Sequence, residues 1–446
     1  MPAFSLFNRI FSQKWVFCLS ALVLASLLSL RAGYLARAVH SFPYNLIVAY
    51  QEAISALKEW RLYLGIEPSN YLFETDRRIA ITSPEPPVSP EDPIFVTGFI
   101  HNRMGLFLLN RQGNVIKEWP VPEIGSIWGD AKHVSPQSSV PKVLWKTHLH
   151  GAVPLPDGSV VVNHSEVGLV RIDRCGQVVW QMPYVTHHSI FPIEGGRFWV
   201  PGRKYHETEL VIPQLRPLPY YEDTILEISS EGKITREISV IRLILAQNFA
   251  GSLFASGRNS IQIGHVDPTH LNDVEVLSAS MAAAFPRFAP GDLLVSLRNI
   301  NLVMVVDPVT EKIKWHQTGP WLHQHDADFL PDGRIMVYDN YPLPDAPRSS
   351  RILAVNPSDG MVDILFQGSG DNTFFADTMG KQQPLEGGHI LVTAPDEGRL
   401  FEVDAQGRGV WEFVNLYPDG RRAILFEGSI YPRSYFEEGA LSCPKG

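Results

Sequence analysis

The stretch HLHGAVPLPDGSVVVNHSEVGLVRIDRCGQVVWQMP, from His148 to Pro183, contains one complete copy of the unit that decides the fold. An alternating segment leads into a Pro-Asp-Gly turn, a β-branched run follows, and a third segment ends at Asp173. A glycine turn then introduces a last segment that carries Trp180. Short apolar runs separated by such turns are typical of antiparallel strands. The unit therefore predicts a small sheet of four strands.

The same unit returns at irregular intervals along the chain. Further copies begin at His187, His270, His323 and Met379, and a less regular copy begins at Ile94. One such sheet cannot bury both of its faces, whereas sheets arranged radially cover one another and leave only short edges. We therefore predict an all-β fold, a six-bladed β-propeller over residues 94–446. The closing tail, AILFEGSIYPRSYF, is expected to supply a strand to the first blade.

The chain before the propeller has a different character. Residues Trp15 to Leu30 are uncharged and apolar, and basic residues stand on both sides of them. Within residues 1–38 this pattern favours an uncleaved signal anchor, a single transmembrane helix. A signal peptide with its cleavage site at Ala36 to Ala38 is the alternative. Either interpretation carries the rest of the chain across the membrane. We expect a single-pass protein of the cytoplasmic (inner) membrane, with its propeller facing the periplasm or the exterior.

Residues 39–93 are predicted to connect this membrane anchor to the propeller. From Phe42 to Ile66, apolar residues recur at helical spacing, which indicates a short helical stalk. A dimerising helix, a helix lying on the membrane and a helix packed on the main domain are alternatives. The Pro-rich segment from Thr82 to Pro93 can form neither a helix nor a central strand, so we interpret it as a linker at the domain boundary.

Charge and cysteine content restrict the partners. The net charge is −9 and no segment is rich in Lys and Arg, so nucleic acid is not expected as a partner. The three cysteines do not have a metal-binding spacing. Cys175 and Cys443 are the two that fall in the predicted propeller, and the sequence does not show whether they pair. It does not reveal the oligomeric state either.

Histidine recurs at one position of the repeat. When the copies are aligned on the residue before the first turn, His150, His188 and His325 occupy the same place, five residues earlier. His270 opens the equivalent strand of a fourth copy. The first strand of a blade lies nearest the propeller axis, so these side chains are expected to converge at one mouth of the channel. We predict a functional histidine cluster; a polar channel lining that holds water is the alternative.

Four segments between about Leu144 and Asn415 carry a family resemblance. They are DPTHLNDVEVLSA with His270, SLRN with Arg298, HQHDADFLPDGRIMVYDN with His325, and GRLFEVDAQGRGVWEFVN near the end. In combination they resemble the bacterial arylsulfotransferase family, periplasmic six-bladed propellers that need no nucleotide sulfate donor.

The resemblance implies transfer of a sulfuryl group from a phenolic sulfate to a phenol acceptor through a channel histidine, with no cofactor and no metal ion. Imidazole suits this chemistry because its neutral form is a nucleophile near pH 7. By resemblance, His270 and His325 are ligands or acid–base groups. Arg298 and Arg351 are candidates for binding the anionic group, as Arg residues do in phosphoryl transfer. Arg348 is an equal rival to Arg351.

One departure from the family leaves enzyme activity open. The register of the family's nucleophilic histidine reads MGKQQ in this chain, with Gly380 and Lys381. The nucleophile is therefore another histidine of the cluster, His150, His188 or His325, or it is missing.

Two other functions stay open beside sulfuryl transfer. The first is a non-catalytic, membrane-anchored propeller that binds a glycan or a protein partner. The second is a metalloenzyme with histidine ligands, in which Asp267 and Asp273 would orient His270.

Overall fold

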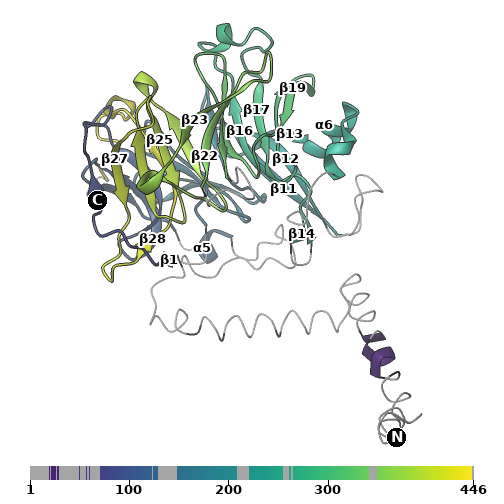
Figure 1. The fold of residues 1–446 in the computed structure, drawn as a ribbon, viewed down its shortest axis with the longest axis horizontal. Coiled ribbons are helices and arrows are strands. Elements are labelled where there is room, and N and C mark those ends of the chain that lie inside the picture. The colour runs from purple at the N-terminus through teal and green to yellow at the C-terminus, as the bar shows by residue number, and fades with distance from the viewer. Residues whose placement is uncertain are drawn as a thin grey trace, which may run out of the picture. The chain divides into compact units, whose positions relative to one another are not determined.

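The computed structural model of the protein describes residues 71–122, 124–128, 148–207, 220–254, 261–262, 265–340 and 349–443, together with residues 20, 22–26, 28–29, 50, 57 and 60. The chain divides into two compact units, and the larger comprises residues 69–215 and 219–446. This larger unit is a six-bladed β-propeller, as the repeat predicted, and Figure 1 shows the sheets following one another along the chain.

The six blades are antiparallel sheets apart from one short parallel pairing, β12 with β15 in blade 3, and the strands of each are named in spatial order. Blade 1 contains β29 (Leu425–Ile430), β3 (Ile94–Ile100), β4 (Arg103–Leu109) and β5 (Val115–Trp119). Blade 2 contains β6 (Ala152–Pro154), β7 (Val160–His164), β8 (Gly168–Ile172) and β9 (Val178–Met182). Blade 3 contains β10 (Phe191–Ile193), β11 (Arg197–His206), β12 (Tyr220–Ile228) and β13 (Ile234–Ser239), with β15 (His265–Val266) and β14 (Ile261–Gln262) added at the end of β12.

The remaining blades follow the same plan. Blade 4 contains β16 (Leu271–Val276), β17 (Leu293–Leu297), β18 (Leu302–Asp307) and β19 (Lys312–Thr318). Blade 5 contains β20 (His325–Phe329), β21 (Ile335–Asp339), β22 (Arg351–Val355) and β23 (Val362–Gln367). Blade 6 contains β24 (Lys381–Pro384), β25 (Ile390–Ala394), β26 (Arg399–Val403), β27 (Gly409–Val414) and β2 (Ile81–Thr82).

Several short strands and helices accompany the six blades. β1 (Leu72–Phe73) pairs with β28 (Arg422–Ala423). In the described part of the propeller unit the helices are α5 (Ile124–Trp128), α6 (Val240–Ala246) and the short 3₁₀ helices η2 (Ala250–Phe254), η4 (Ala282–Ala284), η5 (Arg298–Ile300), η6 (Gly370–Asn372), η7 (Glu386–Gly388) and η8 (Arg433–Tyr435). Because β1 and β2 pair with strands of the propeller, its compact unit includes residues that precede the predicted boundary at Ile94.

Both ends of the propeller sequence meet in blade 1. β29 pairs antiparallel with β3, from Leu425 opposite Gly98 to Ile430 opposite Ile94, which confirms that the tail supplies a strand to the first blade. In Figure 1 the yellow C-terminal strands accordingly lie beside the blue strands of blade 1. A sheet built from both ends of the propeller sequence closes the ring of blades.

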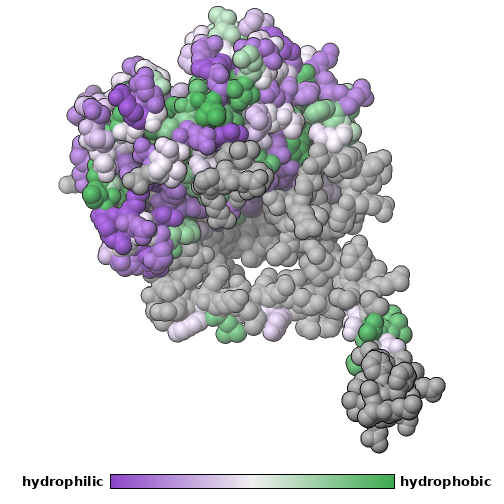
Figure 2. Space-filling model, in the orientation of Figure 1, coloured by the Kyte–Doolittle hydropathy of each residue, from purple (hydrophilic) through white to green (hydrophobic). Residues whose placement is uncertain are grey.

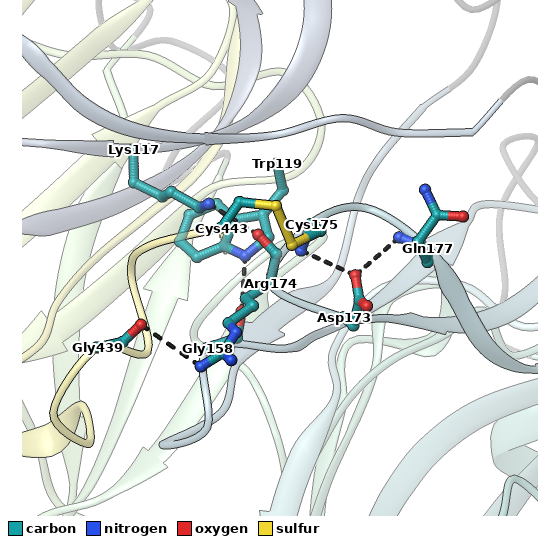
Figure 3. Close-up of a disulfide and its surroundings, with 9 residues drawn as sticks. All are labelled: Lys117, Trp119, Gly158, Asp173, Arg174, Cys175, Gln177, Gly439 and Cys443. Atoms are coloured by element: carbon teal, nitrogen blue, oxygen red, sulfur yellow. Dashed lines mark hydrogen bonds between the residues drawn. A yellow bond between two sulfur atoms is a disulfide. The ribbon is translucent and has the colours of Figure 1, made fainter. Parts of the chain in front are cut away.

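A disulfide holds the tail beyond β29 to blade 2. Cys443 is bonded to Cys175 in the turn between β8 and β9, with the two Cα atoms 5.2 Å apart. Figure 3 shows the surroundings: Trp119 Nε1 donates to the Gly158 carbonyl at 2.7 Å, and Lys117 also reaches the turn that holds Cys175. The disulfide, whose pairing the sequence left open, therefore reinforces the junction at which the ring closes.

The core lies between the blades. Strands such as β18 (LVMVVD) and β25 (ILVTA) are apolar almost throughout because a neighbouring blade covers each face. The outer strand β23 instead exposes Ile364, and Met361 just before it is also exposed. Figure 2 shows a mostly hydrophilic propeller surface with smaller hydrophobic patches, as expected when the apolar faces pack against one another.

Side chains connect the first strands of neighbouring blades. Asp273 of β16 accepts a hydrogen bond from the Ala327 N–H at 3.1 Å, and Asp326 of β20 accepts one from the Gln382 N–H at 2.6 Å. Glu427 of β29 binds the start of blade 2 in the same way. These carboxylates satisfy backbone groups that no further strand covers, so Asp273 and Asp326 have a structural role beside the histidines.

The predicted membrane anchor and helical stalk lie mostly outside the described residues. Of residues 1–70, only residues 20, 22–26, 28–29, 50, 57 and 60 are described. No helix within the described part of the chain is long and apolar enough to cross a membrane. The anchor and the stalk stay predictions.

Candidate functional site

Four histidines from four blades lie together, and we name them the histidine cluster: His150, His188, His270 and His325. His188 is central, because its ring centroid is 4.5 Å from that of His150, 5.0 Å from that of His270 and 5.9 Å from that of His325. Each residue stands at, or just before, the first strand of its blade. The structure thus has the convergence that the repeat predicted, while the catalytic role of these residues stays a prediction.

The backbone at the cluster adopts a conformation that is rare for residues with a side chain. The φ angles of His188 and His270 are 59° and 52°, in the left-handed region, which costs roughly 1–2 kcal/mol per residue. Gly151 leaves room for the His188 carbonyl, since a Cβ at Gly151 would lie 1.4 Å from that oxygen. Asn163 Nδ2 donates to the same oxygen at 2.8 Å. Unfavourable backbone that is held this firmly is typical of functional sites.

A buried carboxylate orients His270. Asp267 Oδ2 lies 2.5 Å from His270 Nδ1, and Asp267 Oδ1 accepts the His270 N–H at 3.2 Å. Burial alone would raise the pKa of the Asp267 carboxyl, but Arg203 and His270 together lower it below its ordinary value. Asp267 is therefore ionised, and His270 Nδ1 donates a proton to it. These two contacts fix the orientation of the His270 ring.

An amide orients His325. His325 Nδ1 lies 2.8 Å from Asn340 Oδ1. Asn340 Nδ2 donates to the carbonyls of Ala376 and Met379, at 2.9 and 2.8 Å, which fixes the oxygen toward the histidine. His325 Nδ1 must therefore carry the proton, and its Nε2 carries a lone pair.

A second histidine stands behind His188. The Nδ1 atoms of His187 and His188 are 2.7 Å apart, close enough to share one proton. His187 is completely buried, and its Nε2 lies 3.7 Å from Asp223 Oδ1. Arg203 Nε donates to the same carboxylate oxygen at 3.3 Å. His187 thus lies between Asp223 and His188: it is within hydrogen-bond distance of His188, and its Nε2 faces the Asp223 carboxylate without a hydrogen bond.

Most of the clustered imidazoles are neutral near pH 7. Burial lowers the pKa of His150 to about 3, and nearby histidines and Lys381 contribute to the same shift. Burial, followed by the neighbouring histidines, lowers the pKa of His188 well below 6.5. Burial and then Arg298 have the same effect on the pKa of His325. Neutral imidazoles have a free lone pair, which a nucleophile or an anion-transfer site needs.

The two predicted arginines lie in different surroundings. Arg298 follows β17, its N–H donates to the His270 carbonyl at 3.0 Å, and its guanidinium donates to Asn299 Oδ1. Among the described residues it forms no ion pair. Arg351 is bound to Asp339 Oδ2 at 2.7 Å and to the Pro320 carbonyl. Arg298 is therefore the better candidate for holding an anion, and Arg351 has a structural partner. Arg348 lies outside the described residues.

At Gly380, in the register of the family's nucleophilic histidine, the packing leaves no room for a side chain. Gly380 has a φ of 102°, and a Cβ on it would lie 2.6 Å from the ring of Tyr338. The next residue, Lys381, pairs with Asp326 Oδ1 at 2.9 Å. The departure noted in the sequence is therefore built into the packing of blades 5 and 6.

Sequence reasoning missed the residues behind the cluster. His187, Asp223, Arg203 and Asn340 were not predicted as site residues. Arg203 is 4% exposed and contacts Asp223, Asp267 and Glu166 together. The adjacent pair His187-His188 was the one signal that could have drawn attention to a proton chain. The carboxylates come from distant strands, which no local pattern connects.

The geometry bears on the metal alternative. Within the described ranges, no group of three or more His, Cys, Asp or Glu side chains is arranged to hold a metal ion. Asp267 contacts His270 as that alternative expected, whereas Asp273 binds the Ala327 N–H instead. The carboxylates around the cluster thus pair with imidazole, guanidinium and backbone groups.

The fold and the site together define a six-bladed propeller with histidines gathered at the start of its blades. The chain belongs to the arylsulfotransferase (ASST) family, whose sequence model matches residues 151–416. This confirms the family that the sequence resemblance indicated.

Comparisons with curated sequences and with solved structures give weaker information than the family match. No curated protein sequence matches the chain. A protein of unknown function from Bacteroides caccae is 12% identical, with a TM-score of 0.41 over 72% of this chain and 94% of that one. A streptogramin B lyase is 12% identical, with a TM-score of 0.42 over 82% and 95%. Virginiamycin B lyase from Staphylococcus aureus is 11% identical, with a TM-score of 0.37 over 76% and 89%. These likenesses support no conclusion about function.

Proposed function

We propose that this protein transfers a sulfuryl group from a phenolic sulfate to a phenolic acceptor through one histidine of the cluster, without a nucleotide donor. One observation carries the proposal: imidazoles from four blades meet, burial keeps three of them (His150, His188 and His325) neutral, and Arg298 beside them has no carboxylate partner in the described part of the chain. A lone pair beside a fixed cation suits attack on an anionic sulfur centre.

Arg298 supplies the charge that the transferring group needs. The three oxygens of a sulfuryl group carry negative charge throughout the transfer, much as those of a phosphoryl group do. The guanidinium lowers the pKa of His325, after burial, and so acts within the cluster. Bound to the sulfate oxygens, it would position the sulfur and stabilise the charge as the bond to the phenol breaks.

His270 supplies the acid and the base. Its Nδ1 donates to the ionised Asp267, so its Nε2 can carry a proton for the departing phenolate oxygen. When the acceptor phenol enters, the same Nε2 can take the phenolic proton. One residue in both roles suits a reaction whose two halves are mirror images.

The test is release of 4-nitrophenol from 4-nitrophenyl sulfate by the purified protein, with phenol as acceptor and no nucleotide present. Release that depends on phenol, with phenyl sulfate as the second product, is the expected result. Absence of release from folded protein would contradict the proposal. Metal analysis of the same sample then separates the alternatives: bound metal would favour a metalloenzyme, and its absence a binding propeller for a glycan or a protein.

We also propose that the propeller acts outside the cytoplasm, tethered to the inner membrane by residues 1–38. The Cys175–Cys443 disulfide supports this, because disulfides persist in oxidising compartments. Alkaline phosphatase fused after Ile66 is expected to be active, since that enzyme needs an oxidising compartment. An inactive fusion would contradict the placement.

A further inference from the structure

Burial, and then Arg203, lower the pKa of His187 below its ordinary value, and burial does the same for the pKa of His188. Both rings are therefore neutral near pH 7, and their contact admits only two proton arrangements. With their Nδ1 atoms 2.7 Å apart, one of the two rings must donate and the other accept. If His187 donated, its neutral ring would turn an Nε2 lone pair toward Asp223. If His188 donates, His187 keeps its proton on Nε2, where it faces that carboxylate at 3.7 Å.

Asp223 decides between the two arrangements. Burial alone would raise the pKa of its carboxyl, but Arg203 and His187 lower it, so Asp223 is an anion. Thr269 Oγ1 and the Leu271 N–H also donate to it, at 2.5 and 2.8 Å, which holds it in place. A buried anion attracts an N–H and repels a lone pair. His188 therefore carries its proton on Nδ1 and presents an unprotonated Nε2 to the cluster.

We propose that His188 is the nucleophile of the sulfuryl transfer, and that Asp223 and His187 form a relay that accepts its Nδ1 proton and later returns it. The inference rests on the proposed function and answers the question that Gly380 leaves open. His188 also has the central place, because its ring contacts all three other members of the cluster.

The step balances within these residues. The Nε2 lone pair of His188 forms the N–S bond as the bond between sulfur and the aryl oxygen breaks. The phenolate leaves with the bonding pair and takes a proton from His270. The Nδ1 proton of His188 passes to His187 Nδ1, which leaves a neutral sulfo-imidazole and a His187 imidazolium facing Asp223. When the acceptor phenol attacks sulfur, that proton returns and His188 departs as neutral imidazole rather than as a poor imidazolate leaving group.

His325 offers a lone pair as well, but not this proton path. Its Nδ1–H donates to the Asn340 amide oxygen, which is too weak a base to take the proton. Sulfation of His325 would leave a cationic ring, and Arg298 already disfavours positive charge there. The two histidines therefore differ in the fate of the Nδ1 proton: His188 can pass it to His187, whereas His325 must keep it.

Replacement of the nucleophile by glycine, with imidazole added back, tests the assignment. His188→Gly suits the backbone, since glycine accepts a φ of 59° without strain. We expect phenol-dependent release of 4-nitrophenol to fall about a thousandfold or more, and added imidazole to restore part of it. His325→Gly is the matched control, with a smaller loss and no rescue. Rescue of His325→Gly in place of His188→Gly would overturn the assignment. Inactive wild-type protein would instead contradict the proposed function itself.

The relay needs its own readout, because His187 is a positioning residue and could be merely structural. His187→Asn keeps an oxygen that can accept the His188 Nδ1–H but cannot take the proton. We expect the first turnover to slow about 100-fold, with KM and melting temperature near those of the wild type. His187→Leu is the companion variant. Leucine can neither take the proton nor hold His188 in its Nδ1–H tautomer, so we expect the first turnover to slow further. A first turnover at the wild-type rate in His187→Asn would overturn the relay.

Discussion

His188 in blade 3 and His325 in blade 5 occupy equivalent places in the repeat, and the difference lies behind them. Both present an unprotonated Nε2, but His188 is backed by a histidine and a carboxylate, whereas His325 is backed by the amide of Asn340. An amide fixes a tautomer and does no more. A histidine–carboxylate pair can also receive a proton.

Blade 6 completes the comparison. At the same place it has Gly380, packed so closely on Tyr338 that no side chain fits. A propeller repeats its backbone from blade to blade, so it offers equivalent positions in every blade and can vary what stands at each. The chemistry can therefore move from one blade to another while the fold stays the same.

The largest expected effect on transfer activity comes from a substitution that displaces the His188 backbone and leaves its side chain unchanged. Gly151→Ala puts a Cβ 1.4 Å from the His188 carbonyl oxygen, and we expect it to abolish transfer and to lower the free energy of unfolding by about 3 kcal/mol or more. Gly195→Ala, in the blade of His188, is the control. It has a φ of 78° but meets only Arg197 Nε at 3.9 Å, so about 1 kcal/mol is expected. Equal melting temperatures and equal activities for the two variants would contradict this account of the site.

The next effect separates the two predicted arginines. Arg298→Gln should lower kcat/KM for 4-nitrophenyl sulfate about 100-fold or more, because it removes the cation beside the cluster. Arg351→Gln should leave kcat/KM nearly unchanged but destabilise the fold by about 3 kcal/mol, because it strands the buried Asp339. Kinetics and thermal unfolding of both variants check this. The reverse pattern would make Arg351 the anion-binding residue.

A smaller effect should depend on the leaving group. A nitro group stabilises phenolate, so 4-nitrophenol can leave without a proton, whereas phenol cannot. His270→Gln is therefore expected to slow phenyl sulfate about 100-fold and 4-nitrophenyl sulfate only about 10-fold. Paired measurements on the two donors check the acid role. An equal loss for both donors would contradict it.

The smallest expected effect is the response to pH. Burial holds the pKa of His188 well below 6.5, so its lone pair stays free as the pH falls through that value. Only near its lowered pKa would protonation remove the nucleophile. The kcat/KM of wild-type protein for 4-nitrophenyl sulfate should therefore not fall by more than about twofold as the pH is lowered from 8 to 6. A fall of activity centred near pH 6.5 would point to an ordinary, exposed imidazole.

The repeat made most of the fold predictable. Turn glycines and β-branched runs such as VVVNH define strands locally, and six copies leave few arrangements other than a propeller. The closing role of the tail could also be inferred, because residues 425–430 are an unpaired strand sequence at the far end. The early start of the propeller could not, since β1 and β2 are two-residue edge strands that pair with residues more than three hundred positions away.

The site was predictable only in part. A histidine that recurs in register identified His150, His188, His270 and His325, because a period in sequence becomes a shared place in the fold. Their supports lie on other strands: Asp223 on β12 reaches His187, and Asn340 after β21 reaches His325. The sequence showed that Gly380 departs from the histidine pattern of the other blades. It did not show the reason, which is that the ring of Tyr338 in the neighbouring blade packs against Gly380.

The measurement that tests the central claim most directly is the location of the sulfuryl group. Wild-type protein is mixed with 4-nitrophenyl sulfate without an acceptor, stopped at alkaline pH, digested and analysed by mass spectrometry. We predict one equivalent of 4-nitrophenol and the added mass of SO₃ on the peptide that contains His188. The added mass on a peptide containing His150 or His325, or turnover with no modified histidine, would contradict the account.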